Sequence, residues 1–114
     1  MDKEFAKTWL EKLKNFWFNK DIEGAVSLFT KTKFYQETPF MEAYTTFNEI
    51  VNEWQHIKNE NIQKIDIKIL AIDKYTLIAQ WILKQNGKDY DGIYEIKFND
   101  NLECIYFKSW KMVK

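Results

Sequence analysis

Few side chains in this chain of 114 residues have the chemistry of a nucleophile, a proton carrier or a metal ligand. The single cysteine, Cys104, excludes an intrachain disulfide and any multi-cysteine zinc or iron–sulfur site. The single histidine, His56, leaves no cluster of imidazole ligands and no histidine relay. We expect Cys104 to pack within a strand as a small hydrophobe. His56 should face solvent near the end of a helix, where a positive charge is favourable.

One pair of carboxylates lies close together in the sequence. Asp89 and Asp91 flank Tyr90 at the start of an expected strand, so both carboxylates lie on one face of it. Because they follow a hairpin turn, we expect both to be solvated rather than catalytic. No glycine-rich segment precedes a helix, as a phosphate site would require. The sequence therefore predicts no metal and no cofactor.

The charged residues are balanced. Seventeen lysines oppose 17 acidic residues, the formal net charge is zero, and arginine is absent. A nucleic-acid-binding protein normally carries excess positive charge and uses arginine to bind phosphates and base edges, so that class is disfavoured. Charges interrupt the N-terminal apolar pattern, and no run approaches the roughly 20 apolar residues of a membrane span. We expect one soluble, cytoplasmic domain over residues 1–114, without a membrane or nucleic-acid partner.

The first half of the chain has the apolar spacing of helices. Apolar residues recur every three or four positions over 5–17, 22–29 and 47–57. Asp2 and Asp21 are suitable N-caps for the first two helices, and Thr46 with Glu49 has the spacing of a capping box for the third. A short extended piece, 34–36, lies between the second and third helices.

From residue 62 onward the apolar period changes to two. This pattern predicts strands at about 62–72, 75–84, 89–98 and 102–110. The links between them are short, and Asn86-Gly87 is a strong hairpin signal because both positions tolerate positive φ. Consecutive short turns produce an antiparallel meander, so the predicted fold class is α+β.

Some of these strands are apolar on both faces. Ile78 and Ile82 alternate with an apolar set on the same strand, and Ile105 and Phe107 do so in the last strand. Three helices can cover only one face of the sheet. The simplest cover for the other face is a second copy of the sheet, which predicts a homodimer; scattered exposed apolar residues on a wide sheet are the alternative.

Several segments, in their order along nearly the whole chain, resemble the nuclear transport factor 2-like superfamily and its SnoaL-like branch. The segment 21–29 resembles that superfamily's second helix, 34–40 its short strand, and 92–98 its penultimate strand. Ile50 with Trp54, and Ser109-Trp110, match its third helix and last strand. The resemblance implies a cone-shaped domain whose three N-terminal helices pack on the concave face of a curved antiparallel sheet. It also implies an apolar pocket and a convex face that often forms a dimer.

The resemblance does not carry over a complete catalytic pair. Its steroid-isomerase-like branch places an acid directly before the proline of the short strand, where this chain has Thr38. A second acid of that branch falls on Tyr94, whose hydroxyl could still donate to an oxyanion. Glu37 lies one residue from the expected position and could act as a base only if the chain shifts there. An isomerase or dehydratase that uses Tyr94 and Glu37 is therefore an alternative, and enzyme activity stays open.

The aromatic content, 18%, is the remaining functional signal. In the implied fold, six aromatic residues should join Tyr94 around one pocket: Trp17, Tyr35, Phe40, Trp54, Trp81 and Trp110. Any one of them could simply be a core residue, but aromatic walls with a few polar groups are typical of small-molecule sites. Glu37, Gln80, Glu95 and tyrosine hydroxyls could supply the polar groups. We expect a domain that binds a small organic ligand; the other alternative is an interaction domain whose own side chains fill the cavity.

Overall fold

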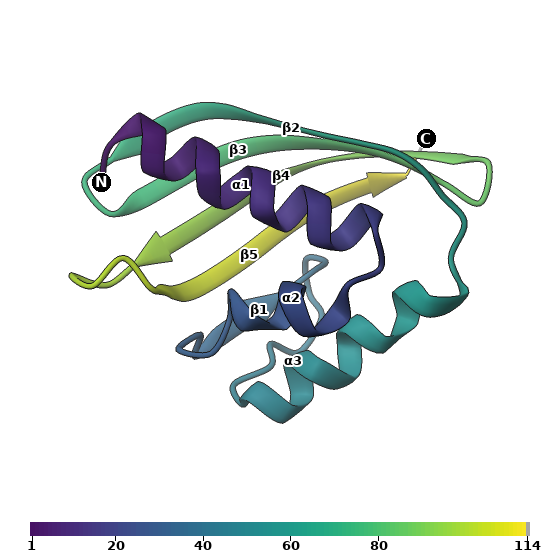
Figure 1. Ribbon diagram of the computed structural model, residues 1–114, viewed down its shortest axis with the longest axis horizontal. Helices are drawn as coiled ribbons and strands as arrows, with labels where there is room; N and C mark the ends of the chain where they lie inside the picture. The colour runs from purple at the N-terminus through teal and green to yellow at the C-terminus, as the bar shows by residue number, and fades with distance from the viewer. Residues whose placement is uncertain (114) are drawn as a thin grey trace.

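The computed structural model describes residues 1–113, which form three helices, a short 3-10 helix and five strands (Figure 1). In chain order the elements are α1 (Lys3–Phe18), α2 (Ile22–Ser27), β1 (Phe34–Gln36), α3 (Phe47–Trp54), η1 (Gln55–Asn59), β2 (Ile62–Asp73), β3 (Thr76–Gln85), β4 (Lys88–Phe98) and β5 (Cys104–Val113). The α+β class and the order of its elements are as the sequence predicted. None of the helices within residues 1–113 has the length and apolar character needed to cross a membrane.

Side-chain caps fix where the helices begin. An Asp2 carboxylate oxygen accepts from the Phe5 amide at 2.8 Å, and an Asp21 oxygen accepts from the Gly24 amide at 2.9 Å. Thr46 and Glu49 form the predicted capping box at the start of α3. These bonds satisfy amides that a helix leaves free in its first turn, so three polar side chains decide where the chain becomes helical.

The sheet has the strand order β1-β5-β4-β3-β2. Strands β2 to β5 form the predicted antiparallel meander, and Asn86 and Gly87 adopt positive φ in the β3–β4 hairpin. The sheet as a whole is not purely antiparallel, because β1 pairs with β5 in parallel. Strand β1 therefore extends the meander at the edge formed by β5 and leaves β2 as the opposite edge of the sheet.

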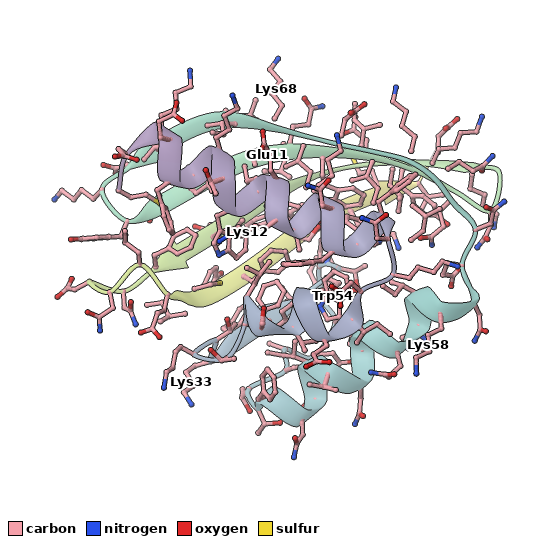
Figure 2. All side chains as sticks on the ribbon, viewed as in Figure 1. Glu11, Lys12, Lys33, Trp54, Lys58 and Lys68 are labelled. Carbon is pink, nitrogen blue, oxygen red and sulfur yellow. The ribbon has the colours of Figure 1, made fainter. Side chains whose placement is uncertain are left out.

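The helices all cover one face of the sheet, which we call the inner face (Figure 1). Helix α1 runs along the sheet, whereas α2 and α3 gather beside β1. The buried core lies between them and includes Leu10 and Leu13 of α1, Phe29, Ile50 of α3, and Leu77 and Ile96 of the sheet. Lysines labelled in Figure 2, including Lys33, Lys58 and Lys68, are exposed at the periphery.

The opposite, outer face of the sheet carries exposed apolar side chains. Ile82 is 43% exposed and Trp110 is 38% exposed, and Met112 is also exposed. Strict alternation predicts Ile105 and Phe107 on one face of the last strand, but Phe107 lies on the inner face and is only 2% exposed, whereas Ile105 is 36% exposed. The cause is a register shift: Phe98 pairs with Cys104 and Lys97 with Tyr106, so strict alternation fails at the start of β5.

Gly92 makes room for a tryptophan in the middle of the sheet. It pairs with Trp81 across β3 and β4, and a Cβ atom at residue 92 would collide with the Trp81 indole. A glycine inside a strand lowers its stability, but here it lets the indole lie against the backbone. The position of Trp81, and of whatever the indole contacts on its other side, thus depends on Gly92.

We predict that Gly92→Ala lowers the free energy of unfolding by about 1–3 kcal/mol, because the methyl group displaces the Trp81 ring. Urea denaturation followed by circular dichroism measures the change. The matched control is Asp89→Ala, an exposed position on the same strand, which should alter stability by less than about 0.5 kcal/mol. Equal stability of the two variants would contradict this account of Gly92.

Candidate functional site

A cavity of about 250 Å³ lies between the inner face of the sheet and the segment formed by α3 and η1. Its apolar wall is largely aromatic and is formed by six rings from six elements: Trp17, Tyr35, Trp54, Trp81, Tyr94 and Phe107. Trp54 reaches into the interior from the end of α3 (Figure 2). The volume suits a compact organic molecule of roughly the size of a single ring with substituents.

The rings hold one another in place. The Trp17 indole meets Trp54 edge to face at a centroid distance of 6.2 Å, with 85° between the planes. Trp17 also meets Trp81 at 6.3 Å, and Trp81 stacks on Tyr94 at 5.7 Å. Aromatic pairs at such distances each add stability beyond their buried area. The wall of the cavity is therefore a connected set of rings rather than isolated side chains.

The polar end of the cavity is a hydrogen-bonded pair from β1 and the residue after it. The Tyr35 hydroxyl donates to a Glu37 carboxylate oxygen at 2.6 Å. Because the two residues are two positions apart in extended chain, their side chains point to the same face, whereas Thr38 points elsewhere. The structure thus places Glu37, not the residue before Pro39, in the lining of the cavity.

Burial raises the pKa of Glu37 from 4.5 to about 7. The Tyr35 hydrogen bond lowers this pKa, the Glu53 carboxylate raises it, and the positive charges of Lys111 and His56 lower it. The pKa of Tyr94, a buried residue that lines the same cavity, is raised by burial and by Glu37, so the phenol stays neutral. At neutral pH the cavity therefore contains a carboxyl that is close to half-ionised and a neutral phenol.

Further polar groups line the cavity and its mouth. Glu53 of α3 lies 3.2 Å from His56 Nε2, and Glu60 and Lys111 belong to the same lining. The Trp81 indole donates to the Ser109 hydroxyl at 3.0 Å. The Trp54 Nε1 group is buried and has no hydrogen-bond partner among residues 1–113.

Several lining residues were not predicted from the sequence, among them the polar residues Ser109, Lys111, Glu53 and Glu60. Ser109 and Lys111 follow Phe107 at steps of two along β5, so strand alternation could have found them once Phe107 was placed inside. No comparable signal marks Glu53 and Glu60, because the 3-10 helix between them was not predicted.

Gln80 and Glu95, which could have supplied polar groups, do not line the cavity. Of the eight residues expected at the site itself, six do. These are Trp17, Tyr35, Glu37, Trp54, Trp81 and Tyr94. Phe40 and Trp110 were expected there and do not line it. Phe40 is fully exposed because it adopts a φ of 67° after Pro39, which directs the chain outward. Trp110 lies on the outer face because it alternates with Ser109.

The remaining chemistry-bearing residues agree with the plainer expectations for them. Cys104 is buried, and burial raises the pKa of its thiol to about 12, so it is unreactive. The His56 side chain is largely exposed at the cavity rim, and Asp89 and Asp91 are exposed on the sheet. Within residues 1–113 no three histidine, cysteine, aspartate or glutamate side chains gather as metal ligands would.

A comparison of the sequence with protein-family models found no match, and a comparison with curated proteins found none either. Solved structures do match. The epoxide hydrolase/cyclase-like enzyme SalBIII, from pyran ring formation in the polyether salinomycin, superposes with a TM-score of 0.81 at 8% identity, covering 97% of this chain and 93% of that one.

Two further structures are similar. A steroid delta-isomerase from Pseudomonas aeruginosa has a TM-score of 0.72 at 13% identity, with 98% of this chain and 82% of that chain covered. An NTF2-like protein from Cytophaga hutchinsonii has a TM-score of 0.67 at 14% identity, with 98% and 100% covered. At these identities the likeness shows the fold alone. The chain has the nuclear transport factor 2-like fold, as the sequence resemblance indicated.

We predict that the Glu37 carboxyl titrates near pH 7 in the folded protein, as followed by carbon-13 NMR of its side chain. Between about pH 4.5 and pH 7 the folded state retains a proton that the unfolded chain has released. Stability should therefore fall as pH rises through this interval, by about 1–3 kcal/mol, and Glu37→Gln should remove this component.

Two tyrosine variants test the cause of the shift. Tyr35→Phe removes the hydrogen bond to the carboxylate, so the pKa of Glu37 should rise further. Tyr94→Phe removes no bond to Glu37 and should leave that pKa nearly unchanged. A Glu37 that titrates near 4.5 would contradict the buried position described above.

Proposed function

We propose that this protein binds a small organic molecule in the aromatic cavity, with Glu37 and Tyr35 at its polar end. The observation that carries the proposal is the hydrogen-bonded Tyr35–Glu37 pair beside six aromatic rings. Burying an ionisable side chain costs free energy, and a carboxyl next to an open apolar cavity can recover that cost by bonding to a ligand. Similar structures include an isomerase and an epoxide hydrolase/cyclase-like enzyme, which supports a small-molecule site.

The second candidate is an enzyme that moves a proton, as an isomerase or dehydratase does. It is favoured by the pKa of Glu37, about 7, because a general base works best when its pKa lies near the working pH. In this proposal Glu37 accepts a proton from carbon beside a carbonyl, and the Tyr94 hydroxyl donates to the resulting oxyanion. The cavity of about 250 Å³ argues against the third interpretation, an interaction domain filled by its own side chains.

The partner proposal concerns the outer face of the sheet. We propose that it joins two copies of the chain about a two-fold axis. Exposed Ile82, Trp110 and Met112 lie beside half-buried Ile78 and Ile93. Both signs of charge occur on this face, including Asp91, Glu95, Lys97 and Lys108. A two-fold axis can therefore place the acids of one copy near the lysines of the other.

For the cavity, we predict that at least one of cyclohexanol, cyclohexanone and cyclohexylamine binds, as detected by saturation-transfer NMR and by the fluorescence of the lining tryptophans. Leu83→Phe should abolish binding because the larger ring occupies the cavity that Leu83 lines. Lys84→Phe is the matched control, since the next residue of β3 is exposed on the outer face and should leave binding intact.

Glu37→Gln and Tyr94→Phe should leave the fold intact and lower the affinity for the probe that binds. Catalysis adds a second readout: a β,γ-unsaturated cyclohexenone should become conjugated, and Glu37→Gln should stop the reaction. Binding of a probe that survives Leu83→Phe would overturn the binding proposal. The absence of binding by all three cyclohexyl probes would overturn it as well. Binding without conversion would leave the protein a binder and remove the isomerase candidate.

For the outer face, we predict a dimer at micromolar concentration, with an interface above about 1,000 Å². Ile82→Glu should dissociate it, because a buried carboxylate in the interface has no partner. Analytical ultracentrifugation measures the mass. The control is Lys12→Glu on the exposed side of α1. It changes the net charge by two, against one for Ile82→Glu, and should leave the dimer intact. A wild-type monomer would overturn the proposal.

A further inference from the structure

The cavity carries more acidic than basic groups, although the chain as a whole is neutral. Glu37, Glu53 and Glu60 line it, against Lys111 and His56. Glu53 and His56 form a pair at 3.2 Å. The Lys111 ammonium lies 4.7 Å from the centroid of the Tyr90 ring, a cation–π contact that holds it at that side of the lining. The lining thus carries three carboxyl groups against one ammonium and one imidazole, an acidic excess that favours a positively charged ligand.

The aromatic wall is built for the same sign of ligand. Aromatic faces carry partial negative charge and attract cations that lie within about 6 Å of the ring centre. Trp17 stands at 85° to Trp54 and at 63° to Trp81, so the three indoles form a corner rather than a flat stack. A corner of ring planes lets one rounded group touch more than one ring. Tryptophan is also the side chain that attracts cations most strongly.

One unsatisfied donor adds a second requirement. Trp54 is 6% exposed, lines the cavity, and its Nε1–H has no partner among residues 1–113. Leaving a buried donor unpaired costs free energy, and an acceptor oxygen on a ligand would remove that cost. The cavity therefore favours a ligand that places a positive group against the rings and an acceptor oxygen near Trp54 Nε1.

We propose that the ligand of this cavity is a small organic cation, a protonated amine or a quaternary ammonium that also carries a hydroxyl or carbonyl oxygen. The inference rests on the proposed binding function and narrows it to a class of ligand. The cationic group lies against the Trp17, Trp54 and Trp81 rings, and the Glu37 carboxylate neutralises its charge. The ligand oxygen accepts from Trp54 Nε1.

Such a ligand couples binding to a proton. A cation beside Glu37 favours the ionised carboxyl, so it lowers the pKa of Glu37 from about 7 and expels the proton held there. Affinity should therefore rise with pH from about 6 to about 8. The groups that face Glu37 from the elements around it are Tyr35 of β1, Glu53 of α3, His56 of η1, Tyr94 of β4 and Lys111 of β5.

The experiment compares two probes of the same shape. Choline carries a trimethylammonium group and a hydroxyl, and in 3,3-dimethyl-1-butanol a carbon atom replaces the nitrogen. Isothermal titration calorimetry of the intact protein should give choline a dissociation constant at least about ten-fold lower than that of the alcohol. From about pH 6 to about pH 8 choline should bind more tightly while the alcohol does not.

Two glutamate variants make the assignment specific. Glu37→Gln should weaken choline binding by at least about ten-fold, with little effect on the alcohol, and should flatten the pH dependence of choline binding. Glu42→Gln removes the same charge from an exposed position outside the cavity lining and should change nothing. Because both variants leave the aromatic wall untouched, circular dichroism should report an unchanged fold.

The outcomes separate this inference from the function on which it rests. If the alcohol binds as well as choline or better, the proposal of a cationic ligand is wrong, whereas the proposal that the cavity binds a small molecule is unaffected. If neither probe binds at ten-millimolar concentration, the cation is also wrong, and the cyclohexyl probes then decide whether the cavity binds ligands at all. A choline affinity that Glu37→Gln leaves unchanged likewise overturns the assignment.

Discussion

The alternation of side chains along the strands is the constraint from which the molecule is built. Strands β3, β4 and β5 carry apolar residues on both faces, and the single set of helices covers one face and leaves apolar side chains exposed on the other. Helix α1 lies along the sheet, but α2 and α3 sit beside β1 and leave space in front of Trp81 and Tyr94. The cavity is the part of the inner face that the helices do not fill. Both proposed surfaces, inner and outer, thus come from the same period of two.

The local structure was predictable because its causes are local. Three helices begin where a side chain caps amides three residues away, at Asp2, at Asp21 and at the Thr46–Glu49 capping box. Asn86-Gly87 sets a hairpin by its own backbone freedom. What failed depended on distant parts of the chain. The parallel pairing of β1 with β5 joins residues more than seventy positions apart, and no pattern within either segment specifies it.

The site was predictable to the extent that strand alternation held. Trp81, Tyr94 and Tyr35 lie on the inner face of regular strands, and they line the cavity as expected. Trp110 and Phe107 were assigned to the wrong faces because the register shift at the start of β5 changes the phase of alternation. Phe40 departs for another reason, since a single residue with positive φ reverses the direction of the chain. Turn conformations at non-glycine residues leave little trace in a sequence.

The unpaired Trp54 indole and the desolvated Glu37 carboxyl have a consequence outside the binding site. Both groups make the empty protein less stable than its packing allows, because each loses water without gaining a full set of partners. An occupant that satisfies them adds its binding free energy to the free energy of folding. In a cell, where unfolded chains are continuously removed by proteases, the steady-state amount of this protein would then follow the concentration of its ligand. The unpaired indole and the desolvated carboxyl would thus make the abundance of the protein depend on the concentration of a ligand that satisfies them.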